Sequence, residues 1–176
     1  TTNYLSGLDH FSISVALVLN GEPILGIVHK PFPKETFSSV KGNGVHYNGK
    51  LLDKVSTTFP ASDALFVTGF PYRSTDLAPA FFTCADEVLT IGRGIRRFGS
   101  AALDVSFLCA GWSQGFWETD LQPYDIAAGL LFLLENGCIV TNEQGAPYDM
   151  FNDRIFVAAL PQVHPILQQT VAKHYS

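Results

Sequence analysis

Apolar and polar residues alternate along much of the first third of the chain, in stretches rich in Val, Ile and Phe. This period of two is typical of strands that bury one face. The pattern predicts three strands that pair as an antiparallel meander, at 10–20, 23–31 and 35–42. The turn NGEP at 20–23 would join the first two as a hairpin, and the Asn-Gly steps of GNGVHYNGK (42–50) indicate tight turns around a short strand.

After a polar stretch, short apolar strands alternate with segments of helical spacing. The expected strands are 64–70, 94–99, 113–119 and 154–159, with a strand and turn at 138–145. The expected helices are 76–90, 100–112, 125–137 and 161–175. Pro161 suits the first position of the last helix. This alternation predicts a layered α/β arrangement with covered sheets. We therefore divide the chain into a central antiparallel sheet portion, 1–63, and a C-terminal α/β portion, 64–176.

Composition places the chain among globular proteins, because 47% of its residues are hydrophobic and 15% are charged. The net charge is −5 and no basic run is present, so nucleic acid is not an expected partner. The longest apolar run, 126–134, is too short to span a membrane, and the first residues do not form a signal peptide. The three cysteines form no C-x-x-C pattern and are expected to be buried free thiols in a reducing cytoplasm.

Asp125 stands where a polar, proline-containing segment meets the apolar run 126–134. An Asp in this place is most often a helix N-cap. It is also a suitable ligand for Mg²⁺, which prefers oxygen and is often held by one or two carboxylates plus a substrate phosphate. The small residues at 127–129 would let the start of the helix pack closely and hold the carboxylate in place.

Two further segments carry groups suited to phosphate and substrate binding. Gly99, Ser100 and Ala101 follow a strand and open a helix, whose first N–H groups can bind an anion, although a simple capped helix has the same pattern. Glu118 ends an apolar strand seven positions before Asp125. A lone Glu at a strand end is usually solvated, but two carboxylates that flank a turn make a cleft more plausible.

Other polar residues carry weaker signals. Thr1 is either part of a frayed terminus or a nucleophile that uses its own amine as base, and nothing else in the chain favours the second reading. Arg96 and Arg97 could face a phosphate, but a solvated pair is the favoured interpretation. Five histidines lack the spacing of metal ligands and are expected in surface or strand roles: His10, His29, His46, His164 and His174.

The stretch GSAALDVSFLCAGWSQGFWETDLQPYDIAAG (99–129) resembles the C-terminal signature of the inositol monophosphatase family, with its G-S/T-A-A, its A-G, its aromatic residue with Glu, and its P-W-D-x-A-A-G. HFSISVALVLNGEPILGIVHKP (10–31) resembles the family's central strands, and GNGVHYNGK its G-x-G-x-x-x-N-G segment. TTNYLSG (1–7) resembles the segment directly after the family's D-P-I/L-D-G metal motif. The similarity runs essentially from end to end.

The chain departs from the family pattern at a few positions. Tyr124 stands where the family usually has Trp, and Gln114 replaces a common Asp. Asn136 and Cys138 interrupt the usual E-A-G-G. None of these four positions is a candidate site residue.

The resemblance implies a Mg²⁺-dependent phosphatase that hydrolyses inositol monophosphate by metal-activated water. It implies one structural domain with a layered αβαβα fold, usually as a cytoplasmic homodimer and often inhibited by lithium. Carried over by position, the expected roles are metal ligand and substrate contact for Asp125, substrate contact for Gly99, Ser100 and Ala101, hydroxyl binding for Glu118, and catalysis for Thr1. Thr1 matches a threonine whose N–H holds phosphate and whose hydroxyl positions the attacking water.

The family's remaining metal ligands, a Glu and two Asp, lie before the T-T-N motif, together with a helical layer and part of the first sheet. We therefore expect these 176 residues alone to bind Mg²⁺ weakly and to turn over slowly or not at all. We also expect exposed apolar sheet surface that promotes aggregation or a non-native dimer. Two alternatives stay open: a phosphatase for another small monoester (fructose bisphosphate, histidinol phosphate or a nucleotide 3′-phosphate), or a non-catalytic fragment that needs an N-terminal partner.

Overall fold

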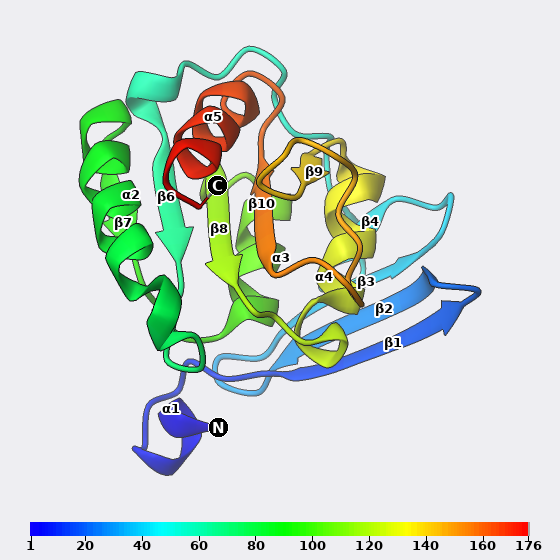
Figure 1. Cartoon of the computed structure of the whole chain (residues 1–176). Helices are drawn as coiled ribbons and strands as arrows, with labels where there is room; N and C mark the ends of the chain where they lie inside the picture. The colour runs from blue at the N-terminus through cyan, green and yellow to red at the C-terminus, as the bar shows by residue number, and fades with distance from the viewer. Residues whose placement is uncertain (176) are drawn as a thin grey trace.

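The computed structural model describes residues 1–175, which form two sheets with helices packed between and beside them (Figure 1). The first sheet is an antiparallel meander in the order β1-β2-β3-β4-β5. Its strands are Ile13–Leu19, Glu22–Lys30, Glu35–Val40, Val45–Tyr47 and Lys50–Leu51. The Asn-Gly pair between β1 and β2 has positive φ at both residues, 50° and 83°, as the predicted hairpin turn requires. The predicted meander is confirmed.

The second sheet is mixed and has the order β7-β6-β8-β10-β9. Its strands are β6 (Leu65–Thr68), β7 (Gly94–Arg96), β8 (Gly115–Thr119), β9 (Ile139–Thr141) and β10 (Ile155–Ala159). β6 pairs in parallel with β7 and β8, whereas β10 runs antiparallel to β8 and β9. The parallel strands are therefore joined by helices, as expected from the predicted alternation of strands and helices.

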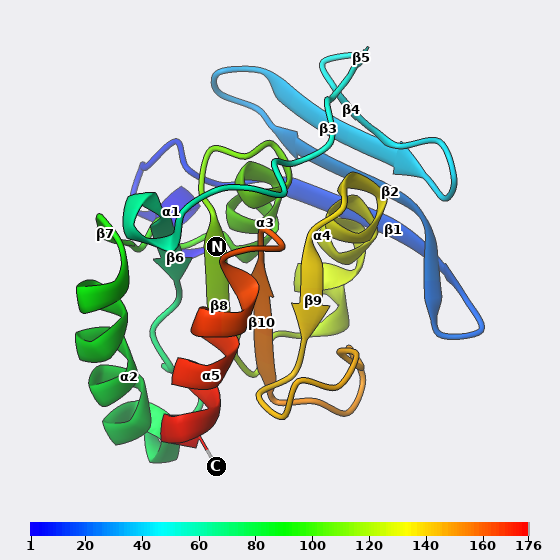
Figure 2. The same cartoon turned by 90° about the horizontal axis from the view of Figure 1, so that it is seen from above.

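The longer helices form two layers around the second sheet. Their bounds are α2 Ala78–Ile91, α3 Ala101–Cys109, α4 Pro123–Asn136 and α5 His164–Tyr175, and a short helix α1 spans Thr2–Leu5. α3 and α4 lie between the two sheets, where α4 packs on β1 and β2 (Figure 2). α2 and α5 lie together against the other face of the second sheet. The layered arrangement expected from the sequence is confirmed, and no helix among residues 1–175 is long and apolar enough to cross a membrane.

Large apolar side chains fill the space between these layers. Phe116 and Trp117 of β8 and Phe156 of β10 are fully buried, and so are Leu103 of α3 and Ile126 of α4. The three cysteines are buried and free, as predicted. Burial of this apolar surface is the main force that holds the sheets and helices together.

The outer face of the first sheet carries a row of exposed apolar side chains. Along β1 exposed and partly buried positions alternate, and the exposed ones are Ile13, Val15, Leu17 and Leu19. The other face of this sheet packs against α4. The sequence prediction of exposed apolar sheet surface is thus confirmed for these residues, and association through it stays a prediction.

All four predicted helices begin at a residue other than the predicted one, and α2 begins at Ala78 rather than at 76 and α3 at Ala101 rather than at 100. α4 begins at Pro123 rather than at 125, because Gln122 serves as N-cap and proline fits the first helical position without losing a hydrogen bond. α5 begins at His164 rather than at Pro161. The N–H groups of Val163 and His164 both donate to the Leu160 carbonyl, which makes the preceding residues a turn.

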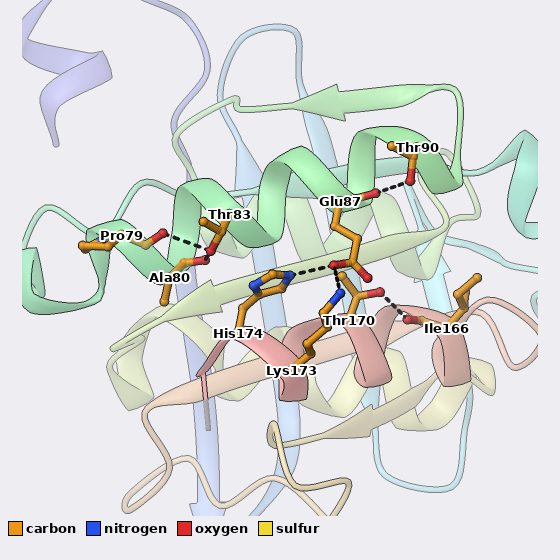
Figure 3. Close-up of polar contacts among 9 residues, drawn as sticks. All are labelled: Pro79, Ala80, Thr83, Glu87, Thr90, Ile166, Thr170, Lys173 and His174. Atoms are coloured by element: carbon orange, nitrogen blue, oxygen red, sulfur yellow. Dashed lines mark hydrogen bonds and ion pairs between the residues drawn. The ribbon is translucent and has the colours of Figure 1, made fainter.

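A polar contact joins α2 to α5, as Figure 3 shows. One carboxylate oxygen of Glu87 accepts hydrogen bonds from Lys173 Nζ at 2.7 Å and from His174 Nε2 at 2.8 Å. These two partners lower the pKa of Glu87. The Lys173 side chain is exposed, whereas those of Glu87 and His174 are partly buried, and a contact of this kind stabilises the protein only modestly.

Candidate functional site

A cleft of about 860 Å³ opens where four stretches of chain, far apart in the sequence, come together. It is lined by α1 and the approach to β1, by the loop after β6, by the start of α3, and by the segment from β8 to α4. All six candidate site residues line it: Thr1, Gly99, Ser100, Ala101, Glu118 and Asp125. The structure therefore brings together every residue that the sequence singled out for the site.

Asp125 is held at the start of α4 by a capping box. Its Oδ2 atom accepts a hydrogen bond from the Gln122 backbone N–H at 3.1 Å. Asp125 is thus the third helical residue and not the N-cap, which corrects the first interpretation of this residue. Because one oxygen is engaged by the backbone, the carboxylate is oriented, and it presents to the cleft an oxygen-donor group of the kind that a hard cation takes.

The first turns of α4 pack very closely on their neighbours. A Cβ atom on Gly26 of β2 would lie 3.0 Å from the Ala128 Cα atom, and one on Gly129 would lie 2.1 Å from Val105 Cγ2 of α3. Glycine at both positions allows α4 to approach the sheet and α3 together. The small residues after Asp125 therefore provide the close packing that the sequence predicted, and this packing fixes the start of α4.

The start of α3 leaves backbone donors free for a ligand. Ser100 is the N-cap, but its side chain makes no capping hydrogen bond and its Oγ lies 3.4 Å from Ser12 Oγ. Gly99 has φ of 90°, a left-handed conformation, and a Cβ atom there would lie 2.6 Å from Arg97 Nη1. The N–H groups of the first turn keep the capacity to bind an anion.

Asn3 ties the segment of Thr1 to the loop before α3. This buried side chain is 8% exposed, and its Nδ2 donates to the carbonyls of His10 at 2.7 Å and Phe98 at 2.9 Å. Thr1 itself stands at the N-terminal end of α1, and its carbonyl accepts a bond from the Leu5 N–H at 2.9 Å. Sequence reasoning did not single out Asn3, although its place directly after the two threonines was a signal.

Glu118 lies at the inner wall of the cleft on β8, and is not a solvated side chain at a strand end. A Cβ atom on Gly69 would lie only 2.1 Å from Glu118 Oε1, so the glycine leaves the room that this carboxyl occupies. Burial raises the pKa of Glu118 to about 8, and the carboxylates of Asp104 and Asp125 act in the same direction. Glu118 can therefore carry a proton at neutral pH and donate as well as accept hydrogen bonds.

Asp104 and His10 form a second polar pair in the cleft wall, which sequence reasoning missed. Asp104 is 1% exposed on α3, and its Oδ1 lies 3.6 Å from His10 Nε2. Neither of these atoms has a hydrogen-bond partner among the described residues. Burial raises the pKa of Asp104, and His10 opposes this shift. His10, expected in a surface or strand role, instead packs between Phe98 and Phe107.

Asp125 fits a role as one ligand of a Mg²⁺ ion. Its carboxylate is oriented, and the charges of Asp125 and Asp104 both raise the pKa of Glu118, an effect that a cation beside Asp125 would oppose. Mg²⁺ commonly completes its coordination with water and substrate phosphate around one or two carboxylates. Within residues 1–175 no group of three or more His, Cys, Asp and Glu side chains is arranged to hold a metal ion.

Comparison with known proteins shows which family the sequence of this chain matches. The sequence model of the inositol monophosphatase family matches residues 1–176. An inositol-1-monophosphatase of Mesorhizobium japonicum is 34% identical over 176 residues, which are 100% of this chain and 65% of that protein. The Nus factor SuhB of Pasteurella multocida is 34% identical over 163 residues, which are 93% of this chain and 60% of that protein.

Solved structures show the same fold. The extragenic suppressor protein suhB of Bartonella henselae aligns with a TM-score of 0.91 at 33% identity, over 98% of this chain and 66% of that one. The inositol monophosphatase of Anabaena aligns with a TM-score of 0.89 at 33% identity, over 99% of this chain and 68% of that one. The chain spans about 60% of the length of the first curated relatives it matches.

Proposed function

The chain belongs to the inositol monophosphatase family, and from this membership we propose that it works in a phosphatase that hydrolyses a phosphate monoester of a polyol. Inositol monophosphate is the expected substrate and Mg²⁺ the expected metal ion. A homodimer and a cytoplasmic location belong to the same proposal. The observation that carries it is the convergence of Thr1, the start of α3, Glu118 and Asp125 on one cleft.

The proposed binding mode rests on the chemistry of each wall. The free N–H groups at the start of α3 suit the negative charge of the substrate, and the backbone N–H and hydroxyl of Thr1 suit the phosphate and its attacking water. Glu118 lines the cleft, and its carboxyl group suits the hydroxyl groups of the polyol. These three contacts would orient the phosphorus for in-line attack, which is a large part of the catalysis of phosphoryl transfer.

Asp125 would hold the metal ion at the phosphate. A Mg²⁺ ion bound there would supply positive charge to the phosphoryl oxygens and favour ionisation of water at neutral pH. The capping box and the close packing of α4 keep the carboxylate in one orientation, so little reorganisation is needed when the substrate arrives. Water would then displace the polyol oxygen directly, and no covalent bond to the chain is required.

Titration calorimetry of inositol 1-phosphate tests this proposal on the protein, without Mg²⁺ and with Mg²⁺ at a concentration high enough to fill a weak site. Mg²⁺ should raise the affinity by about tenfold or more, which is a common size of coupling between two ligands. Asp125→Asn should abolish the enhancement, whereas Asp86→Asn makes the same charge change at an exposed position of α2 and should retain it. Release of inorganic phosphate by the same samples reports turnover. Equal affinities with and without Mg²⁺, or full enhancement in Asp125→Asn, would overturn the proposal.

A further inference from the structure

Arg154 joins two segments of the cleft wall from outside the cleft. It stands directly before β10, and all three nitrogens of its guanidinium group donate to carboxylates. Nε and Nη2 bind the two carboxylate oxygens of Asp120 at 2.9 and 3.0 Å, and Nη1 binds Asp76 Oδ2 at 3.3 Å. The contact with Asp120 is bidentate, which is the strongest and most directional form of an Arg–carboxylate pair.

Asp120 forms the turn that connects the two carboxylates of the candidate site. It follows β8, which carries Glu118, and precedes α4, which carries Asp125. Its φ of 53° lies in the left-handed region, a strained conformation for a residue other than glycine that persists where surrounding contacts hold it. The Asp120 N–H donates to the Arg154 carbonyl at 2.6 Å. Both the main chain and the side chain of Arg154 therefore hold this turn.

Two hydrogen bonds lead from the turn to the carboxylate of Asp125. The Asp120 carbonyl accepts a bond from Gln122 Nε2 at 3.4 Å, and the Gln122 backbone N–H donates to Asp125 Oδ2 at 3.1 Å. The orientation of Asp125 thus depends on the position of Gln122. Gln122 is in turn bound to the residue that Arg154 holds.

Asp76 connects Arg154 to another part of the cleft wall. It lies in a turn of 3-10 helix, Thr75–Leu77, that follows the loop after β6. Residues 69–74 of that loop line the cleft. The guanidinium group therefore ties this loop to the turn between β8 and α4.

The ion pair of Arg93 with Asp63 provides a contrast. It is a single contact at 2.8 Å between residues outside the cleft lining, and the Asp63 side chain is 44% exposed, against 22% for Asp120. An isolated exposed ion pair contributes little to stability, whereas bidentate geometry within a network of charges is the case in which such a contact matters. Arg154 has that geometry.

Resting on the proposed phosphatase function, we propose that Arg154 is a positioning residue of the site, which holds the turn 120–122 through Asp120 and the loop 69–74 through Asp76. Arg154 does not touch the substrate in this scheme. It acts through Asp120, whose turn sets the position of Gln122 and so the orientation of the Asp125 carboxylate. Loss of the guanidinium group should therefore weaken the binding of the metal ion.

Hydrogen exchange measured by mass spectrometry on the protein without Mg²⁺ or substrate tests these contacts directly. Arg154→Gln should raise the exchange rates of amides in 119–126 and in 70–77 by about tenfold, because both segments lose a contact that opposes local opening. Arg93→Gln makes the same charge change at the pair outside the cleft. It should leave both segments at wild-type rates.

Two further variants assign each segment to its carboxylate. Asp120→Asn keeps the shape of the side chain and its tolerance of left-handed φ but loses the charge, so it should raise exchange in 119–126. Its combination with Arg154→Gln should exchange no faster there, because both changes remove one contact. Asp76→Asn, at an exposed position, should raise exchange in 70–77 alone by about threefold. It tests the contact with the loop even if Arg154→Gln proves unstable.

Titration calorimetry of inositol 1-phosphate over a series of Mg²⁺ concentrations tests whether the contacts act on the site. The Mg²⁺ concentration that gives half of the increase in affinity should be about fivefold higher in Arg154→Gln than in the wild type, and unchanged in Arg93→Gln. A purely structural role of Arg154 would lower Tm and leave this concentration as it is. Arg154→Lys keeps the charge without the bidentate geometry and should give an intermediate value.

The two measurements separate this proposal from the underlying one. Wild-type exchange in both segments of Arg154→Gln, or an unchanged Mg²⁺ requirement, overturns the role of Arg154. If Mg²⁺ does not raise the affinity of the wild type, the phosphatase proposal fails. The exchange data then decide alone: faster exchange in both segments upholds Arg154 as the residue that holds the cleft wall, and unchanged exchange overturns it.

Discussion

The contact between Gly129 of α4 and Val105 of α3 sets how closely the two helices that begin at the cleft can approach. A Cβ atom on Gly129 would lie 2.1 Å from Val105 Cγ2 and 3.2 Å from Val105 Cβ. Such a separation is far inside van der Waals contact, so Gly129→Ala must move Val105 or push the helices apart. Asp125 stands one turn earlier on α4, and it would move with that helix.

Two opposing effects decide the sign of this substitution. Replacement of glycine by alanine within a helix favours folding by about 1 kcal/mol through helix propensity. Overpacking of a filled core costs about 1–3 kcal/mol. Val105 is 0% exposed and β-branched, which leaves it one strongly preferred rotamer in a helix, so we place the overpacking cost in the upper part of its range, at about 2–3 kcal/mol. The expected net loss is then about 1–2 kcal/mol, and since 1 kcal/mol corresponds to about 2–4 °C at this chain length, Tm should fall by about 2–8 °C.

A double-mutant cycle followed by urea unfolding measures the effect. Val105→Ala alone removes two buried methyl groups and should cost about 2 kcal/mol. The combined variant Gly129→Ala/Val105→Ala should be more stable than the sum of the two losses predicts by about 1 kcal/mol or more, because the new methyl group enters the vacated space. A Gly129→Ala variant as stable as the wild type, or a cycle that is additive, would refute the steric argument.

Three further predictions concern the cleft wall. Burial raises the pKa of Glu118 in the folded protein to about 8, whereas Glu in the unfolded chain has a pKa of about 4.3. The contribution of Glu118 to the free energy of unfolding is therefore complete below about pH 4.3 and is lost as the pH rises through about 8. Glu118→Gln should flatten this part of a pH series of urea unfolding midpoints, and an unchanged slope would contradict the assignment. Gly69→Ala should displace the Glu118 carboxyl group, because its Oε1 atom would lie 2.1 Å from the new Cβ atom. Calorimetry should then show inositol 1-phosphate binding about tenfold more weakly. Wild-type affinity in this variant would mean that Glu118 does not bind the substrate. Asn3→Ala leaves the carbonyls of His10 and Phe98 without their donor and should lower the free energy of unfolding by about 2 kcal/mol, with wild-type stability as the contrary result.

Local sequence patterns were sufficient for the elements of this fold. Period-two alternation gave the strands of the meander, and the Asn-Gly pair at 20–21 gave the hairpin turn, because both depend on residues adjacent in sequence. The starts of α4 and α5 were each displaced by a few residues, because Pro123 and Pro165 both lie in a first helical turn, where proline is tolerated. Strong periodicity fixes that a helix exists but not its first residue.

In the candidate site, too, the residues recognised from local sequence differ from those recognised only through distant contacts. The six residues of the site were candidates from their local context, and the resemblance, in which many positions agree at fixed spacing, implied their roles. Asn3 bonds Phe98 across 95 positions. Arg97 lies over aromatic rings supplied by the loop after β6. No local pattern contains these partners, so a buried Asn and an aromatic-supported Arg look like ordinary polar residues until the chain is folded.

The cleft combines two sources of positive potential with three acidic side chains, and this balance explains its chemistry. α3 and α4 both begin at the cleft, and each helix end carries about half a positive charge. Asp104, Glu118 and Asp125 oppose that charge. Burial, together with the charges of Asp104 and Asp125, raises the pKa of Glu118 to about 8. The carboxylate of Asp125 would repel a phosphate at the start of α4, so binding of a phosphate there depends on a cation.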